Sequence, residues 1–351
     1  MGAAVTSRQI VERALRLEPT PRLPVSLLSA GAWTLNRSGL SMEQALAAGP
    51  ERIAEAIART NEDVRCDIVW PGSGFHNLAL RAVGGRIKFR ARGTPDVVGP
   101  AVASPSEFDR LRGEGLREDP GIRALVEAAR ILVASIGGTT VVGTSQWAPF
   151  TLGSLAWGAE HVMRAAFKDP PAVHALLEHA SELCYAYLEP FLDAGVSLVS
   201  LADPTASGDM VSSAQFAKYA APYIARVAGR LRARGVSVLV HICGDTTSRL
   251  DQLPGTGAQI MSVDYKVDLA RARQILGGKI ALAGNLNPVA VMQASTPEGV
   301  AEACRACIQA AGPQPGYVLM PGCDIPPSVP VENVRAMVAA AHQANQSEGR
   351  T

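Results

Sequence analysis

The sequence predicts an α/β protein that folds as a single (β/α)8 barrel. Short apolar runs bounded by Gly and Pro alternate with longer stretches rich in Ala, Leu, Arg and Glu. This rhythm is typical of parallel strands that are covered by helices. Eight such runs occur within 351 residues, which is the strand number of this barrel and a normal length for it. We expect one domain, residues 1–345, and a short tail, residues 346–351.

Each expected strand is an apolar run of four to six residues, short enough for a buried strand and too short for a helix. Turn-forming Gly, Pro, Asp or Ser residues stand beside these runs, as they do at the ends of strands. In chain order, the expected strands are 23–28, 67–70, 140–143, 197–201, 236–240, 259–263, 279–283 and 317–320.

Helix start signals stand between several of these strands. Ser212 and Ser213 precede a helix expected to run to about residue 234, and Thr296 caps a helix that has Pro297 in its first turn. The connection 71–138, after the second strand, is unusually long and contains an expected helix, 121–136. Long connections in compact domains are often lids or docking segments, so we expect an insertion or lid region here.

Composition excludes several classes of function. The net charge is +1 and the Lys and Arg residues are scattered, so nothing indicates a nucleic-acid partner. No apolar run approaches the roughly 18 residues of a membrane span. The six cysteines are irregularly spaced in a large chain, which favours reduced thiols over disulfides. We therefore expect a cytoplasmic protein without a membrane segment.

Polar side chains follow the expected strands at their carboxyl ends, where such barrels carry their active sites. Asp203 and Asp264 are candidate catalytic carboxylates. Asn285, after the seventh strand, and His76, after the second, are candidates for contact with a cofactor or substrate.

A metal site is predicted at the same rim. His241 and Cys243 are two residues apart, so in a strand they point to one face, and Cys323 follows the eighth strand. One imidazole and two thiolates favour zinc with an open position over magnesium or calcium. The alternative is that the histidine and the two cysteines are buried in the core and bind no metal. Any one of these residues, considered alone, would favour this alternative. As a fourth ligand we consider water or one of three carboxylates, Asp203, Asp209 and Asp324.

The other cysteines fit a packing role. Cys304 and Cys307 form a Cys-x-x-Cys pair, but it lies inside a helical pattern and has no second pair to complete a metal site. Cys66 and Cys184 are expected in the core. The sequence has neither a Gly-x-x-x-x-Gly-Lys-Ser/Thr phosphate loop nor a Gly-x-Ser-x-Gly nucleophile elbow.

Several motifs together resemble the uroporphyrinogen decarboxylase superfamily. The chain is most similar to its zinc-dependent, corrinoid-linked branch, which includes the methylcobamide:coenzyme M methyltransferases. The resemblance covers nearly the whole chain. The segments that carry it are 14–25, 202–207, 241–247, 263–266, 284–288 and 321–327.

This resemblance implies transfer of a methyl group to or from a cobalt corrinoid, with zinc activating the small acceptor or donor: a thiol, a folate or a methoxylated compound. No His follows an Asp by two residues, so the Asp-x-His-x-x-Gly corrinoid-ligating motif is absent. The corrinoid, as methylcobalamin or on a corrinoid protein, is therefore expected from outside the chain.

Two other hypotheses remain open. Asp67 resembles the aspartate of the decarboxylases, which keeps a metal-independent decarboxylase as the alternative. However, their arginine-rich segment and Gly-His-Gly element are replaced here by Ser29–Thr34 and by Gly322-Cys323-Asp324. A non-enzymatic docking or storage module for a corrinoid protein is the third hypothesis.

Overall fold

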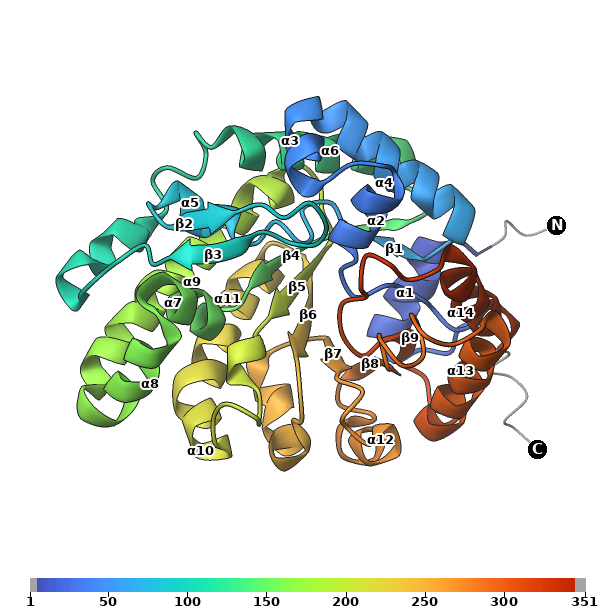
Figure 1. Ribbon diagram of the computed structural model, residues 1–351. Coiled ribbons are helices and arrows are strands. Elements are labelled where there is room, and N and C mark those ends of the chain that lie inside the picture. The colour runs from blue at the N-terminus through green and yellow to red at the C-terminus, as the bar shows by residue number, and fades with distance from the viewer. Residues whose placement is uncertain (1–4, 345–351) are drawn as a thin grey trace.

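The computed structural model describes residues 5–344, so the predicted tail 346–351 lies outside the described residues. Its centre is a curled sheet of seven parallel strands in the order β1-β4-β5-β6-β7-β8-β9 (Figure 1). These strands are β1 Ile68–Val69, β4 Val141–Trp147, β5 Leu198–Ala202, β6 Ser237–Ile242, β7 Ile260–Val263, β8 Ala281–Leu286 and β9 Tyr317–Pro321. The predicted parallel α/β barrel is thereby confirmed.

The expected first strand, 23–28, is not a regular strand but an extended segment that closes the ring. Val25 forms a single parallel bridge with Leu319 of β9. On the other side, the Asp67 amide donates to the Val25 carbonyl oxygen over 2.9 Å, which joins the segment to the start of β1. Pro24 lacks an N–H group, so this run cannot donate a complete ladder of hydrogen bonds.

The barrel interior is filled by residues that alternate along the strands. Because side chains of a strand point to opposite faces in turn, one set faces inward and the other packs against the helices. Val11 and Leu15 of α1 (Ser7–Leu15) join the inward set, so this helix packs against the apolar interior of the barrel. The buried inward set comprises Leu28, Ile68, Trp70, Val141, Leu198, Leu239, Ile260, Ala281, Ala283, Val318 and Met320.

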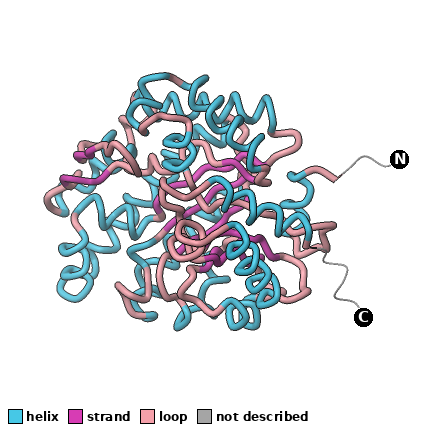
Figure 2. The backbone as a smooth tube through the Cα atoms, turned by 45° about the vertical axis from the view of Figure 1, so that its right-hand side comes forward, coloured by secondary structure: helices cyan, strands magenta, loops and turns pink. Residues whose placement is uncertain are grey.

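Helices surround the sheet (Figure 2). They pack their apolar stripes on the outward side chains of the strands, which is how parallel sheets are buried on both faces. The α-helices are α2 Gly31–Arg37, α3 Met42–Ala48, α4 Pro50–Val64, α5 Leu78–Ala82, α6 Pro120–Ile136, α7 Pro149–Trp157, α8 Ala159–Lys168, α9 Pro170–Asp193, α10 Ser213–Gln215, α11 Ala221–Ala233, α12 Leu269–Leu276, α13 Pro297–Ala311 and α14 Val331–Gln343. The 3-10 helices are η1 Pro105–Arg112, η2 Pro204–Ala206 and η4 Thr247–Thr256, and η3 Phe216–Ala220 is a π-helix.

The helix starts agree with the sequence signals. Thr296 caps α13 by accepting a hydrogen bond from the Gly299 amide, with Pro297 in the first turn. Ser212 caps the segment that continues through η3 into α11, which ends at Ala233. Both boundaries depend on local hydrogen bonds, which is why the sequence located them.

The long connection after β1 contains an antiparallel hairpin, β2 Arg86–Lys88 and β3 Asp96–Gly99. The predicted helix 121–136 is observed as α6, and it contacts β4 and α4 as an ordinary barrel helix does. The segment outside the repeating βα units is therefore 71–119, which we call the crossover segment. Its role as a lid remains a prediction.

Within residues 5–344, no helix has both the length and the apolar character needed to cross a membrane.

Candidate metal centre

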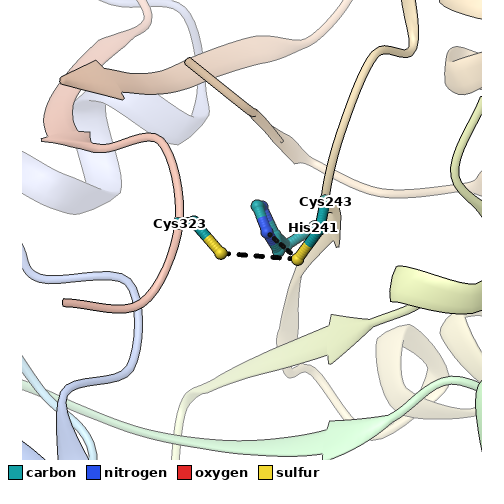
Figure 3. Close-up of side chains that lie close together, drawn as sticks. All are labelled: His241, Cys243 and Cys323. Atoms are coloured by element: carbon teal, nitrogen blue, oxygen red, sulfur yellow. Dashed lines mark hydrogen bonds between the residues drawn. The ribbon is translucent and has the colours of Figure 1, made fainter. Parts of the chain in front are cut away.

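Three side chains predicted from the sequence as metal ligands meet at the carboxyl ends of the strands. The His241, Cys243 and Cys323 ligand atoms all lie within 4.8 Å of one another. His241 Nε2 is 3.1 Å from Cys243 Sγ, and the two Sγ atoms are 3.4 Å apart. Figure 3 shows Cys323 reaching across from a different part of the chain to meet the other two. All six cysteines are free thiols, so this pair is not a disulfide.

A side chain on the neighbouring strand fixes the orientation of the His241 ring. Its Nδ1 atom is 3.1 Å from Ser262 Oγ on β7, and the ring is almost fully buried. Register explains the contact, because His241 of β6 pairs with Ser262 of β7. A hydrogen bond at Nδ1 leaves Nε2 free for a metal, as in most histidine ligands. Ser262 was missed by sequence reasoning, although its inward register beside the β6 histidine was readable from strand alternation.

The contact between the two thiols shifts their pKa values in opposite directions. The hydrogen bond from Cys243 lowers the pKa of Cys323 to about 4, and contact with His241 acts in the same direction. The pKa of Cys243 is raised, first by its hydrogen bond to Cys323 and then by burial. A thiolate is therefore stabilised at Cys323, and thiolate is the metal-binding form of cysteine.

The chain after Cys243 is held in a narrow space. Gly244 has φ of +80°, and a Cβ atom there would lie 2.4 Å from Ser207 Oγ and 2.6 Å from Asp209 Oδ2. Only glycine tolerates both this conformation and this close approach. Gly244 therefore lets the loop after β6 turn directly against the loop after β5.

Arg249 connects the same two loops. Its guanidinium is buried and donates to the carbonyl oxygens of Ala206 and Val211 over 2.7 and 2.6 Å. No Asp or Glu within residues 5–344 forms an ion pair with it. The two Nη groups are bound by backbone carbonyl oxygens, whereas Nε is buried without a hydrogen-bond partner. Arg249 thus connects the loop that follows Cys243 to the loop after β5.

The two predicted catalytic carboxylates occupy different surroundings. Asp264 is buried at the end of β7, accepts a hydrogen bond from the Lys266 amide, and its charge contributes to the raised pKa of Cys243. Asp203 accepts from the amide and the hydroxyl of Thr151, at the start of α7. Burial raises the pKa of Asp203 to about 7. The contacts thus place Asp264 near the thiols and assign Asp203 a helix-capping role; catalytic roles for both remain predictions.

The two predicted cofactor-contacting residues do not lie together. Asn285 donates to the carbonyl oxygens of Asp264 and Val267, and its Oδ1 atom faces Cys307. His76 is buried; its Nε2 is 2.7 Å from Ser145 Oγ, and its ring centroid is 4.4 Å from that of Trp147. Their contacts with a cofactor remain predictions.

The carboxylates considered as a fourth ligand stand outside the group of three among the described residues. Asp209 pairs with Lys266 at 2.8 Å. Asp324 accepts from the amides of Ala30 and Ile325, and burial raises its pKa to about 6. Both carboxylates thus have other partners in the structure, and the identity of the fourth ligand remains a prediction.

The remaining cysteines are buried or half-buried within the structure, in agreement with their predicted packing role. Cys66 and Cys184 are in the core, and burial raises the pKa of Cys66 to about 12. Cys304 and Cys307 lie on α13, away from the three candidate ligands.

Asp67 does not lie at the active rim, and its expected likeness to the decarboxylase aspartate is corrected here. It precedes β1 and so lies at the opposite end of the barrel. Its carboxylate is fully buried and forms a bidentate ion pair with Arg22, at 2.6 and 2.8 Å, and accepts from the Val25 amide. Its role is to fasten the extended segment 23–28 to the barrel.

A family model described as uroporphyrinogen decarboxylase (URO-D) matches residues 6–344, and the chain belongs to this family. It is 28% identical to the methylcobamide:CoM methyltransferase MtbA of Methanosarcina acetivorans, over 96% of this chain and 97% of the relative. It is also 28% identical to a uroporphyrinogen decarboxylase of Anaeromyxobacter sp., over 94% of this chain and 96% of that protein.

The fold agrees with a solved structure. A methyltransferase from Methanosarcina mazei superposes with a TM-score of 0.82 at 22% identity, covering 96% of this chain and 98% of that one. The predicted resemblance is confirmed, and the methyltransferase relatives, together with the His-Cys-Cys group, favour methyl transfer over decarboxylation.

Proposed function

We propose that this chain is a zinc-dependent methyltransferase that moves a methyl group between a cobalt corrinoid and a small acceptor or donor. The observation that carries the proposal is the meeting of His241, Cys243 and Cys323 at the rim of the barrel. Methyltransferase relatives that cover almost the whole chain support it.

The donor set fits zinc. Zinc binds thiolate sulfur at about 2.3 Å and imidazole nitrogen at about 2.0 Å, usually with tetrahedral geometry. Ligand atoms within 4.8 Å of one another can surround such an ion with small side-chain rotations. Ser262 supplies the partner for His241 Nδ1 that histidine ligands usually have. With three protein ligands, one position is left open, as in catalytic sites.

Bound zinc would lower the pKa of a substrate thiol and hold it as a thiolate at neutral pH. The residues of the chain have simpler tasks. Cys243 and Cys323 hold the cation as thiolates, His241 completes the set in a fixed orientation, and Gly244 keeps the loop close. We propose that the corrinoid arrives on a separate protein or free, and that the crossover segment 71–119 contacts it.

The decarboxylase alternative finds little support around this rim. It depended on Asp67, which is bound to Arg22 at the other end of the barrel. Decarboxylases of the family are nevertheless as similar in sequence as the methyltransferases, so CO₂ release is the control reaction.

The test combines metal analysis with an activity assay. We expect purified protein to contain about one zinc per chain. It should either demethylate methylcobalamin with an acceptor from thiol and folate panels, or transfer a methyl group from a member of a methoxyaryl panel to cob(I)alamin. Chelation should abolish the reaction, and added zinc should restore it. Full activity after verified removal of the metal would refute the proposal.

A further inference from the structure

We propose that Trp147 and Ala202 form the wall against which the small methyl donor or acceptor lies, and that the small side chain of Ala202 determines which molecules fit there. This inference rests on the proposed function. It adds two substrate-contacting residues to the three candidate metal ligands and concerns the shape of the barrel mouth.

Strand register places Trp147, Ala202 and His241 in one row across three neighbouring strands. Trp147 of β4 pairs with Ala202 of β5, and Ala202 pairs with His241 of β6. Paired residues of a parallel sheet point to the same face, so the three side chains share the face of the sheet on which the candidate ligands meet.

Alternation along the strands shows that this face is the barrel interior. Leu198 of β5 and Leu239 of β6 belong to the buried inward set. Ala202 lies four residues after Leu198, and His241 lies two residues after Leu239. Because every second residue of a strand points to the same side, Ala202 and His241 point inward as well.

The barrel interior opens to solvent at this row. Trp147 and Ala202 are partly exposed although they point inward. Ser145 and Ser200, which pair with each other one row nearer the amino ends of the same strands, are each only 2% exposed. The two candidate thiol ligands are partly exposed too. A molecule that reaches the thiols from this side of the mouth therefore lies over the Ala202 methyl group.

The crossover segment holds the indole of Trp147 in one orientation. Its Nε1–H group donates to Asn77 Oδ1 over 2.8 Å, and Asn77 Nδ2 donates to the Pro95 carbonyl oxygen over 2.8 Å. The His76 ring packs against the indole, with ring centroids 4.4 Å apart. An aromatic side chain that is already fixed can contact a ligand without a further loss of side-chain entropy.

Ala202 has no room to become larger without entering the mouth. Its carbonyl oxygen accepts from the Ala148 amide over 2.8 Å, and the next amide, that of Asp203, donates to the His241 carbonyl oxygen over 2.8 Å. The end of β5 is thus bonded to both neighbouring strands and cannot move aside. A longer side chain at this position would extend over the surface between the indole and the imidazole.

The alternative is that Trp147 serves packing alone. The other three tryptophans of the chain, Trp33, Trp70 and Trp157, are 1%, 6% and 9% exposed, as expected for packing residues. Trp147 is more exposed than any of them. A ligand that covers the indole accounts for this difference, whereas packing within the chain does not.

Binding of two thiols of different bulk, 2-mercaptoethanol and phenylmethanethiol, tests the inference. It is measured by the thiolate absorption of cobalt-loaded protein, so the readout does not depend on turnover. Ala202→Leu should weaken the binding of 2-mercaptoethanol by about tenfold or more, the effect of extra methylene groups in a fitted site. Its zinc content should stay unchanged, because no candidate ligand is altered.

Two further variants change the relative binding of the two thiols. Ala202→Gly enlarges the mouth and should favour phenylmethanethiol over 2-mercaptoethanol several-fold compared with wild type. Trp147→Ala removes an aromatic contact and should disfavour phenylmethanethiol by about fivefold. Ala339→Leu, the same enlargement at an exposed position of α14, is the matched control and should leave both affinities unchanged.

Wild-type affinity for 2-mercaptoethanol in metal-loaded Ala202→Leu would overturn the inference and leave the proposed function intact. If Ala202→Leu does not fold, the other two variants decide, and a wild-type ratio of the two thiols in both would overturn it. Wild-type protein that binds neither thiol, and transfers no methyl group between a corrinoid and any member of the panels above, would overturn the proposed function and this inference with it.

Discussion

We call the loops that follow β5 to β9 the metal-side loops; they are residues 203–212, 243–256, 264–268, 287–296 and 322–330. These loops and the crossover segment 71–119 lie on the rim of one barrel but are built in opposite ways. The metal-side loops are short, rich in Asp, and fixed by buried contacts such as Arg249 on the Ala206 carbonyl oxygen. The crossover segment is long and extends a hairpin with exposed basic residues, among them Arg86 and Lys88.

The comparison illustrates how one fold can meet two structural requirements, a rigid site and an exposed surface, in different segments. A metal centre needs ligand atoms held to within fractions of an ångström, which short, buried loops on strand ends provide. A surface for a macromolecular partner needs exposed area and charge, which a long insertion provides. The two regions should therefore respond differently to substitution.

The largest expected effect comes from removing a ligand. Cys323→Ala should abolish both zinc binding and methyl transfer, because two remaining ligands hold zinc far more weakly. Cys307→Ala, a cysteine outside the three, is the matched control and should keep both. Metal content by mass spectrometry and the methylcobalamin assay measure the outcome. Retention of stoichiometric zinc in Cys323→Ala would exclude Cys323 as a ligand.

Arg249→Met should affect stability and, through it, the metal centre. Two buried carbonyl oxygens lose charged donors, a loss partly offset by removing a buried charge, so we expect about 2 kcal/mol lower unfolding free energy. The exposed Arg110 of the crossover segment is the comparison, since Arg110→Met should change the unfolding free energy by less than about 0.5 kcal/mol. Urea unfolding measures both. Equal effects would contradict the contrast between the regions.

Ser262→Ala should weaken zinc binding by about tenfold, the usual cost of removing the partner of a histidine ligand. Ser262→Thr keeps the hydroxyl and should retain most of the affinity. Competition with a chromogenic chelator gives both constants. If the alanine variant holds zinc as tightly as wild type, the hydrogen bond at His241 Nδ1 does not tune the centre.

The smallest effect is expected on the crossover side, at His76. Burial lowers its pKa to about 3 from the ordinary value of 6.5. Between these values the unfolded chain binds a proton that the folded protein does not, so stability falls as pH drops below 6.5. The slope contribution reaches about 1.4 kcal/mol per pH unit.

His76→Gln removes this contribution, so the variant should lose less stability than wild type between pH 6.5 and 5.5, while its zinc content is unchanged. Urea unfolding at the two pH values, with metal analysis beside it, provides the check. An identical pH dependence in both proteins would show that folding does not lower the pKa of His76.

Much of the fold and of the candidate site could be predicted from residues close in sequence. Thr296 and Pro297 mark the start of α13 because capping is local. The spacing of His241 and Cys243 predicted that the two side chains lie together, and they do so at the end of β6, with Cys243 just beyond the strand. Asp67 is an example of a residue whose position could not be predicted in this way. Its sequence context resembled that of a catalytic aspartate, but its ion pair with Arg22, distant in sequence, assigned it to the opposite end of the barrel.

The sequence by itself determined the β/α rhythm, the ligand types and the acidity of the metal-side loops, because these depend on composition and short-range periodicity. Only the tertiary structure decided that Cys323 reaches Cys243, eighty residues away, that Ser262 orients His241, and that Arg249 and Lys266 are already paired. Such contacts depend on strand register and loop packing, which bring together side chains that no local pattern connects.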